Sequence, residues 1–359
     1  MDANHHVLKI EEQAARDLDL LERAAPRKEE RGERRPAIAV TLRDLLTRDL
    51  PPREMLLAPW LQSQSLSMIH AWRGVGKTHV ALGIAYALAA GGKYLDWHAP
   101  APVPVLYLDG EMPGAALKDR CAAIVAAAEV DAQEGFLRFV TPDLQPDGVM
   151  PDLATREGQE AIEALLGDAR VIVVDNISCL VRSGGKENDA DSWAGVAQWA
   201  LRMRASGRSV MFVHHSGKSG LQRGTSKRED LLDTVILLRR PTDYEPSQGA
   251  RFEVNFEKAR ALFGKDVSPF EAKLETDAQG RQTWKTADAS NNLRDRAIEL
   301  HELGLSQADI AGELGCARST IMRGLREAER EGKTTRPVVK RKLASVTSIK
   351  GKRREPDDD

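Results

Sequence analysis

The sequence predicts an α/β fold in which a mostly parallel β-sheet is flanked by helices and followed by a small all-α unit. Between about residues 38 and 286, short apolar runs alternate with Ala- and Leu-rich helical segments, as in βαβ units. The runs VIVV (171–174) and VMFV (210–213) are apolar throughout, which is typical of strands covered on both faces. After residue 291 the apolar spacing becomes purely helical.

The individual elements follow from the positions of these runs. Strands are expected at 66–71, 104–110, 137–141, 169–176, 209–215, 233–240 and 251–260. Helices are expected at 79–90, 115–130 and 158–166. The last two strands have little helix between them, so we expect them to be antiparallel at one edge of the sheet.

Composition and charge divide the chain further. A length of 359 residues suggests two domains, and a net charge of -2 gives no overall electrostatic case for nucleic acid. Residues 1–37 form a charged segment, with a short helix expected around 8–21 and a disordered linker after it. The α/β domain is expected at 38–288, the helical domain at 291–333, and a disordered basic tail with an acidic end at 334–359.

Cysteine spacing and hydropathy indicate the cellular compartment of the protein. The three cysteines, Cys121, Cys179 and Cys316, are far apart and form no C-x-x-C pair, which argues against a disulfide framework or a zinc site. The N-terminus has no apolar signal core, and no apolar run is long enough to span a bilayer. We therefore expect a cytoplasmic protein.

The segment 69–82, IHAWRGVGKTHVAL, is nearly a phosphate-binding P-loop, G-x-x-x-x-G-K-[ST], between a strand and a helix. Ala71 stands at the first glycine position, and Trp72 after it has no evident role. Backbone amides and the helix N-terminus would cradle phosphate, Lys77 would contact the β/γ-phosphates, and Thr78 would hold Mg²⁺. The expected nucleotide-binding residues are Gly74, Val75, Gly76, Lys77, Thr78 and His79. The alternative is a strand–turn–helix in which Gly-Lys-Thr is incidental.

Carboxylates close two other apolar strands, where ligands bind in open α/β sheets. Asp175 ends VIVVD and is a candidate Mg²⁺ ligand, although it can instead cap the segment that follows. YLDGEM places Asp109 and Glu111 at another strand end. Glu111 is the better candidate for the base that orients and deprotonates water, and Asp109 is interpreted as structural. The alternative for this pair is a solvated strand end.

The order of the P-loop, YLDGEM, VIVVDN, VMFVHH and FEKARALFG resembles the RecA-like ATPase core of hexameric replicative helicases, of the bacterial DnaB and plasmid RepA types. The similarity covers residues 51–285, and such P-loops often begin with Ala. It implies ATP and Mg²⁺ as cofactors, Glu111 as the residue that polarises water, and Asp175 as a Mg²⁺ aid. It also implies His215 as a polar sensor, with His214 less favoured.

The same resemblance implies that the active site is completed by a second subunit. Lys258 and Arg260 form a K-x-R pair, and a period of two places both side chains on one face of a strand. In DnaB-type rings this pair reaches into the neighbour's nucleotide site as an arginine finger, with Arg223 as a rival here. The alternative is an exposed strand carrying two solvated cations. If the resemblance holds, function requires a homo-oligomer, most simply a hexamer.

Two turn-rich segments follow strands and correspond, by this resemblance, to loops that line the central channel of a ring and bind single-stranded DNA. The second, 217–228, carries the candidate phosphate contacts Lys218, Arg223, Lys227 and Arg228. The first, 181–193, mixes basic and acidic residues and is the weaker candidate. Ordinary solvated loops are the alternative for both.

The C-terminal helical unit resembles the helix-turn-helix of resolvases and many regulators. Ser306 is a candidate N-cap, and apolar residues recur at helical spacing at Ile310, Ala311, Leu314, Ile321, Leu325 and Ala328. The expected DNA contacts on the last helix are Arg318, Ser319, Thr320 and Arg323. A helical protein-interaction module is the alternative.

Together these features predict an ATP-hydrolysing DNA-binding protein, with a RepA-like hexameric DNA helicase of a plasmid or mobile element as the preferred hypothesis. The alternative is an ATP-switched DNA-binding regulator or loader without unwinding activity. A recombination accessory that forms filaments is a weaker third hypothesis.

Overall fold

The computed structural model describes residues 37–182, 190–216, 229–241, 243–260, 262–314 and 316–334. The chain forms two compact units, Met1–Pro52 and Arg53–Asp359. Within the first unit the described residues form helix α2 (Leu42–Thr47), which Thr41 and Asp44 begin with a capping box. No residue of α2 is buried, so residues 38–52 group with the N-terminal segment and not with the α/β domain, where we expected them. The predicted helix at 8–21 and the C-terminal tail lie outside the described residues.

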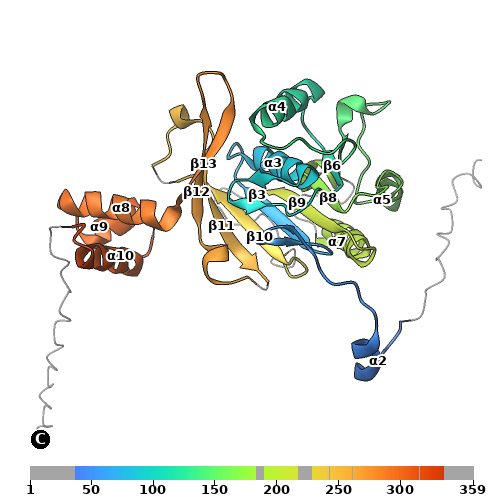
Figure 1. Cartoon of the computed structure of the whole chain (residues 1–359), viewed down its shortest axis with the longest axis horizontal. Helices are drawn as coiled ribbons and strands as arrows, with labels where there is room; N and C mark the ends of the chain where they lie inside the picture. Colours follow the sequence, from blue (N-terminus) through green and yellow to red (C-terminus); the bar gives the residue numbers. More distant parts are fainter. Residues whose placement is uncertain are drawn as a thin grey trace, which may run out of the picture. The chain divides into compact units, whose positions relative to one another are not determined.

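The second unit is organised around a nine-stranded sheet in the order β13-β12-β11-β10-β3-β9-β8-β6-β7. The six strands from β10 to β7 run parallel, and β11, β12 and β13 add to one edge in antiparallel fashion. The strands are β3 (Leu66–Ala71), β6 (Val105–Asp109), β7 (Leu137–Val140), β8 (Val171–Asp175), β9 (Ser209–His215), β10 (Thr234–Arg239), β11 (Arg251–Ala259), β12 (Phe270–Thr276) and β13 (Gln282–Asp288). The predicted parallel sheet with an antiparallel edge is therefore confirmed (Figure 1).

Helices cover both faces of the parallel part of the sheet. Alternate side chains of each strand enter two different cores, so that Ile69 and Ala71 of β3 face one layer while Leu66 and Met68 face the other. The first layer contains α3 (Lys77–Ala90) and α4 (Gly114–Ala127). The second contains α5 (Arg156–Glu163), α6 (Ile177–Leu180) and α7 (Ala190–Ala205). Short 3-10 turns occur outside these layers at Pro142–Leu144, Pro246–Gln248 and Gly264–Val267.

Helix α3 is buried on nearly every side, which explains its uniformly apolar sequence. The hairpin of β4 (Lys93–Tyr94) and β5 (Trp97–His98) packs directly on it. A Cβ on Gly83 of α3 would lie 2.0 Å from the Tyr94 ring, so only glycine admits this contact. A smaller hairpin, β1 (Met55–Leu57) with β2 (Leu61–Gln62), precedes the sheet.

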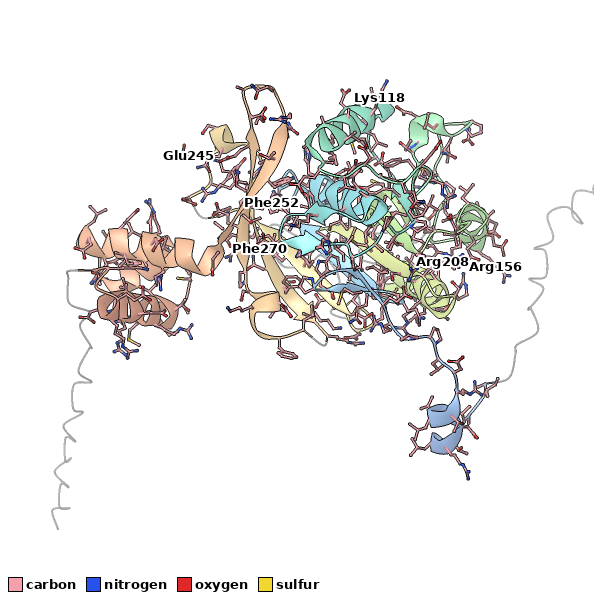
Figure 2. The ribbon with its side chains drawn as sticks, viewed as in Figure 1. Lys118, Arg156, Arg208, Glu245, Phe252 and Phe270 are labelled. Atoms are coloured by element: carbon pink, nitrogen blue, oxygen red, sulfur yellow. The ribbon has the colours of Figure 1, made fainter. Side chains whose placement is uncertain are left out.

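Strands β12 and β13 were not predicted from the sequence. Both alternate polar residues with buried or half-buried ones, so they lack the continuous apolar runs that mark the central strands. They are held by aromatic packing: Phe270 meets Trp97 with ring centroids 5.9 Å apart, and Phe252 of β11 meets Trp284 at 5.2 Å. Phe252 and Phe270 are labelled in Figure 2 on this antiparallel part of the sheet.

Between residues 289 and 330 the chain forms α8 (Ala289–Glu302), α9 (Gln307–Glu313) and α10 (Arg318–Arg330). They share a core of Ala297, Leu300, Ile310, Ala311, Leu314, Ile321 and Leu325. The Ser306 hydroxyl accepts a hydrogen bond from the Asp309 amide at 3.2 Å, which is the predicted N-cap. The six apolar residues predicted at helical spacing are all buried in this unit.

Candidate functional site

The P-loop joins β3 to α3 and explains why Ala71 can replace glycine. Ala71 is the last residue of β3, paired with Leu238 and His215, so its backbone is extended and needs no positive φ. Positive φ occurs instead at Gly74 (+74°) and Gly76 (+127°). A Cβ on Gly76 would also lie 3.3 Å from the Phe252 ring. Glycine is therefore required at the two later positions, near the start of the helix, and not at the first.

The beginning of α3 presents donors for an anion. No side chain caps the helix, and its first internal hydrogen bond runs from the Val80 amide to the Gly76 carbonyl. The amides of residues 77–79 thus have no acceptor within the helix. The buried Lys77 ammonium donates to the carbonyls of Ala71 (3.2 Å) and Trp72 (3.3 Å). Burial lowers the pKa of Lys77 to about 8, although Asp175 and Glu111 oppose this shift. Amides and ammonium together fit a polyphosphate.

Two further groups hold the loop in place. Trp72, for which the sequence suggested no role, is partly buried and packs against the core that contains α3. Arg240, which follows β10, donates to the Gly74 carbonyl at 3.0 Å and stacks over the Tyr244 ring at 4.2 Å. Arg240 was missed by the sequence analysis because only tertiary structure brings the end of β10 to the loop.

Asp175 ends β8, level with Asp109 of β6, and is 2% exposed. It accepts hydrogen bonds from the Tyr107 hydroxyl at 2.6 Å and from the Thr78 hydroxyl. Burial raises its pKa to about 6, and these two donors oppose the shift. A buried carboxylate beside the P-loop hydroxyl suits a divalent cation, since such an ion would offset the cost of burial. Thr78 and Asp175 therefore fit the predicted Mg²⁺ role.

Asp109 shapes its own turn, as its interpretation as structural predicts. Its Oδ1 accepts from the amides of Glu111 (3.4 Å) and Met112 (3.3 Å), and its Oδ2 accepts from the Thr141 hydroxyl at 3.1 Å. Burial raises the pKa of Asp109, while these donors lower it. The turn it stabilises presents Glu111 at the end of the strand.

Glu111 is linked to His215 through Asn176, a residue the sequence analysis did not select. The Asn176 side-chain nitrogen donates to Glu111 Oε2 at 3.0 Å and lies 3.3 Å from His215 Nε2. The Cys179 thiol also donates to Glu111 at 3.3 Å, and burial, followed by Glu111, raises the pKa of that thiol to about 12. The position of Asn176, directly after the strand-ending Asp175, is the feature of the sequence that could have identified it. The candidate base and the candidate sensor thus lie in one cluster.

These residues line one cavity of about 600 Å³, which contains the P-loop (74–79), Glu111, Asp175, Asn176 and His215. A second cavity of about 420 Å³ shares the lining residues His79 and Arg120 with it. Its remaining walls are mainly apolar and aromatic, and include Tyr86, Tyr94, Leu95, Ile124 and Trp284. A site with one polar and one aromatic compartment fits a ligand with a phosphate end and an aromatic end.

Lys258 and Arg260 lie away from this cluster. Lys258 donates to the carbonyls of Glu229 and Asp230, and Arg260 donates to the same Asp230 carbonyl at 2.9 Å. Both side chains therefore lie on the same side of the chain at the end of β11, where Lys258 is in the strand and Arg260 directly follows it. The neighbouring Ala259 is level with Thr234 of β10, which is level with Ser67 at the start of β3. Arg260, whose amide donates to the Asp233 carbonyl, thus lies at the opposite end of the strands from the P-loop, and Lys258, level with Met68 through Val235, extends its ammonium to that end.

The predicted nucleic-acid contacts are described only in part. Lys218, Arg223, Lys227 and Arg228 lie outside the described residues, as does most of the 181–193 segment. On α10, Arg318, Ser319 and Arg323 are exposed, and Thr320 is half-buried. In the ranges that the structure describes, no helix combines the length and apolar character needed to cross a bilayer.

Comparison with known proteins gives one family match and several structural similarities. Two solved structures are similar in fold: a KaiC-like protein from Pyrococcus horikoshii OT3 (14% identity, 65% of this chain and 93% of that chain, TM-score 0.43) and the flagellar accessory protein FlaH from Methanocaldococcus jannaschii (15% identity, 63% and 91%, TM-score 0.43). A family model described as AAA domain matches residues 28–220, more than half of the chain. The chain therefore belongs to the AAA domain family and carries a P-loop NTPase core.

Proposed function

We propose that this protein is an ATP-driven, ring-forming DNA motor, a RepA-like hexameric helicase of a plasmid or other mobile element. The observation that supports a ring is the separation of two sets of groups along the strands. The P-loop, Glu111 and His215 lie at one end of the parallel strands, and the Lys258 ammonium and Arg260 lie towards the other, at the Asp230 carbonyl before β10. Cations placed there serve hydrolysis most directly in a neighbouring subunit's site.

Within one subunit, each residue of the cluster has a chemical task. Lys77 and the first amides of α3 would bind the β- and γ-phosphates of ATP, and Thr78 and Asp175 would hold Mg²⁺. The bound ion would supply charge neutralisation on the phosphates. Glu111 would orient and accept a proton from the attacking water, and His215, reached through Asn176, would respond to the γ-phosphate. The adjoining aromatic cavity with Trp284 would receive the nucleoside.

The first test is ATP hydrolysis with and without single-stranded DNA, together with the mass of the assembly in ATP. Wild-type protein is expected to hydrolyse ATP faster with DNA and to sediment as a hexamer, and Lys77→Ala should hydrolyse nothing. Strand separation on a forked duplex would then establish a helicase. A stable monomer without ATPase activity would refute the proposal.

Mixing two inactive variants tests whether Arg260 acts in the nucleotide site of a neighbouring subunit. Arg260→Ala keeps its P-loop, and Lys77→Ala keeps its finger, so a mixed ring regains some complete sites. At equal amounts, random mixing makes about a quarter of the head-to-tail interfaces complete. Partial recovery on mixing supports a finger in trans, whereas no recovery assigns the defect to each subunit alone.

The C-terminal helices favour a second candidate function, an ATP-switched DNA-binding regulator or loader. A three-helix core presents Arg318, Ser319 and Arg323 at the start of α10, the position from which recognition helices read the major groove. In that case Arg323→Ala abolishes duplex binding and function, while Lys258→Ala has little effect. If the protein is a motor, Lys258→Ala should instead abolish DNA-stimulated ATP hydrolysis, and Arg323→Ala should have little effect on it.

A further inference from the structure

A buried histidine joins three strands at the end of the sheet that carries the P-loop. His70 is the penultimate residue of β3 and is 0% exposed. Its Nδ1 lies 2.8 Å from the hydroxyl of Ser216, which follows β9, and its Nε2 lies 2.7 Å from Glu257 Oε2 on β11. An ionised carboxylate only accepts hydrogen bonds, so an ionised Glu257 requires a proton on His70 Nε2, and the Ser216 hydroxyl is the partner of Nδ1.

The strand register shows that Glu257 is brought to His70 by an irregularity in β11. Val235 of β10 pairs with Lys258 and Ile236 pairs with Phe256, so Glu257 is the extra residue of a β-bulge. Bulges re-aim a side chain that regular alternation would point elsewhere. The residue directly after this bulge is Lys258, the first member of the K-x-R pair. The hydrogen bond between His70 and Glu257 therefore holds the bulge in β11, one residue before Lys258.

The other end of the same chain of hydrogen bonds reaches the phosphate site. The Ser216 amide donates to the Ala71 carbonyl at 2.9 Å, and this carbonyl also accepts from the Lys77 ammonium. Ser216 directly follows His215, the candidate sensor. Ser216, His70 and Glu257 thus connect the P-loop and sensor at one end of the sheet with Lys258 and Arg260 at the other.

Packing alone does not account for these groups. The other residues of β3 that face the same helical layer are apolar, namely Leu66 and Met68. An imidazole paired with a carboxylate gives up hydration on burial, and an apolar side chain of similar volume often gives equal or greater stability. The Ser216 hydroxyl is also 2% exposed, which excludes it as a nucleophile for a dissolved substrate.

We propose that His70 is a positioning residue for ATP hydrolysis, because its hydrogen bond to Glu257 sets the bulge that places Lys258 and Arg260. This inference rests on the proposed ATPase function. Lys258 and Arg260 also bond the carbonyls of Glu229 and Asp230, so one stretch of β11 contacts the chain on both sides of residues 217–228. DNA-stimulated turnover is accordingly the quantity most sensitive to His70.

Two substitutions separate the two hydrogen bonds. In His70→Gln the amide nitrogen takes the place of Nε2 and keeps the bond to Glu257, whereas in His70→Asn the amide takes the place of Nδ1 and keeps only the bond to Ser216. His70→Gln is expected to retain DNA-stimulated kcat within about threefold, and His70→Asn to lose roughly tenfold to a hundredfold, the scale of a misplacement of about 1 Å. KM and the thermal shift caused by Mg-ATP should stay the same in both, since the P-loop is intact.

Glu257→Ala provides a second route, because its side chain is 37% exposed and its loss is less disruptive to folding. It should reproduce the kcat loss of His70→Asn. Glu253→Ala is the matched control, a carboxylate on the same strand that bonds Arg239 instead, and it should leave kcat unchanged. Equal losses in Gln and Asn variants, or wild-type kcat in Glu257→Ala, would overturn the proposal. An inactive wild type overturns the proposed function itself, so the two failures are distinguishable.

Discussion

The substitution Asp175→Asn is expected to stabilise the nucleotide-free protein while abolishing its response to Mg-ATP. The carboxylate is 2% exposed, and its pKa of about 6 compares with 3.8 for an unperturbed group. At about 1.4 kcal/mol per pH unit, this difference corresponds to about 3 kcal/mol lost on burying the ionised group. Asn has the same shape and keeps an acceptor for the Tyr107 hydroxyl, so most of this free energy should be regained.

The sign of the effect depends on pH. Because folding raises this pKa, the folded protein binds the proton more tightly than the unfolded chain does. The destabilisation is therefore fully present above about pH 6 and disappears as the pH falls towards 3.8. Asp175→Asn should exceed wild type by about 2–3 kcal/mol at pH 8, and this advantage should shrink steadily towards pH 4.5.

Urea denaturation at pH 8 and pH 4.5 measures both free energies of unfolding. Asp266→Asn, at an exposed position, is the control and should differ little from wild type at either pH. Thermal denaturation with and without Mg-ATP measures nucleotide binding: Mg-ATP should stabilise wild type and should stabilise Asp175→Asn only slightly. An advantage that is independent of pH, or a variant less stable than wild type at pH 8, would refute the burial argument.

Three further predictions follow from the same site. The pH profile of kcat/KM should be bell-shaped, falling below about 6 as Asp175 takes up a proton and above about 8 as Lys77 loses one; a flat profile between 5 and 9 would contradict both assignments. Gly76→Ala should abolish ATP binding in a fluorescence titration, because the added Cβ meets Phe252 and φ is +127°, whereas retained binding would show that the loop adapts. Asn176→Ala should lower kcat about tenfold or more with unchanged ATP affinity, since Glu111 and His215 lose their common partner; an affinity loss of equal size would instead place Asn176 in binding.

Local sequence patterns were sufficient for the central part of the fold and for the candidate nucleotide site. Continuous apolar runs identify strands covered on both faces, and polar residues at their ends necessarily gather at one edge of a parallel sheet. Glu111 and Asp175 were predicted in this way, Lys77 and Thr78 from the P-loop motif, and His215 from the family resemblance, and the structure brings all of them to one cavity. The helices of the C-terminal unit were equally predictable, because amphipathic spacing and the Ser306 cap are local properties.

Tertiary structure decided the groups whose partners are distant in sequence. Arg240 reaches the Gly74 carbonyl, and Asn176 joins Glu111 to His215, only because β10, β8, β6 and β9 end near one another. The strands β12 and β13 have only a short alternating pattern, and the aromatic contacts that hold them join residues distant in sequence. The bulge at Glu257 and its bond to His70 depend on the register of β11 against β10, which is set by packing across the whole sheet. Residue types and spacing thus determined which chemistry this chain can perform, whereas long-range strand pairing decided which side chains position it.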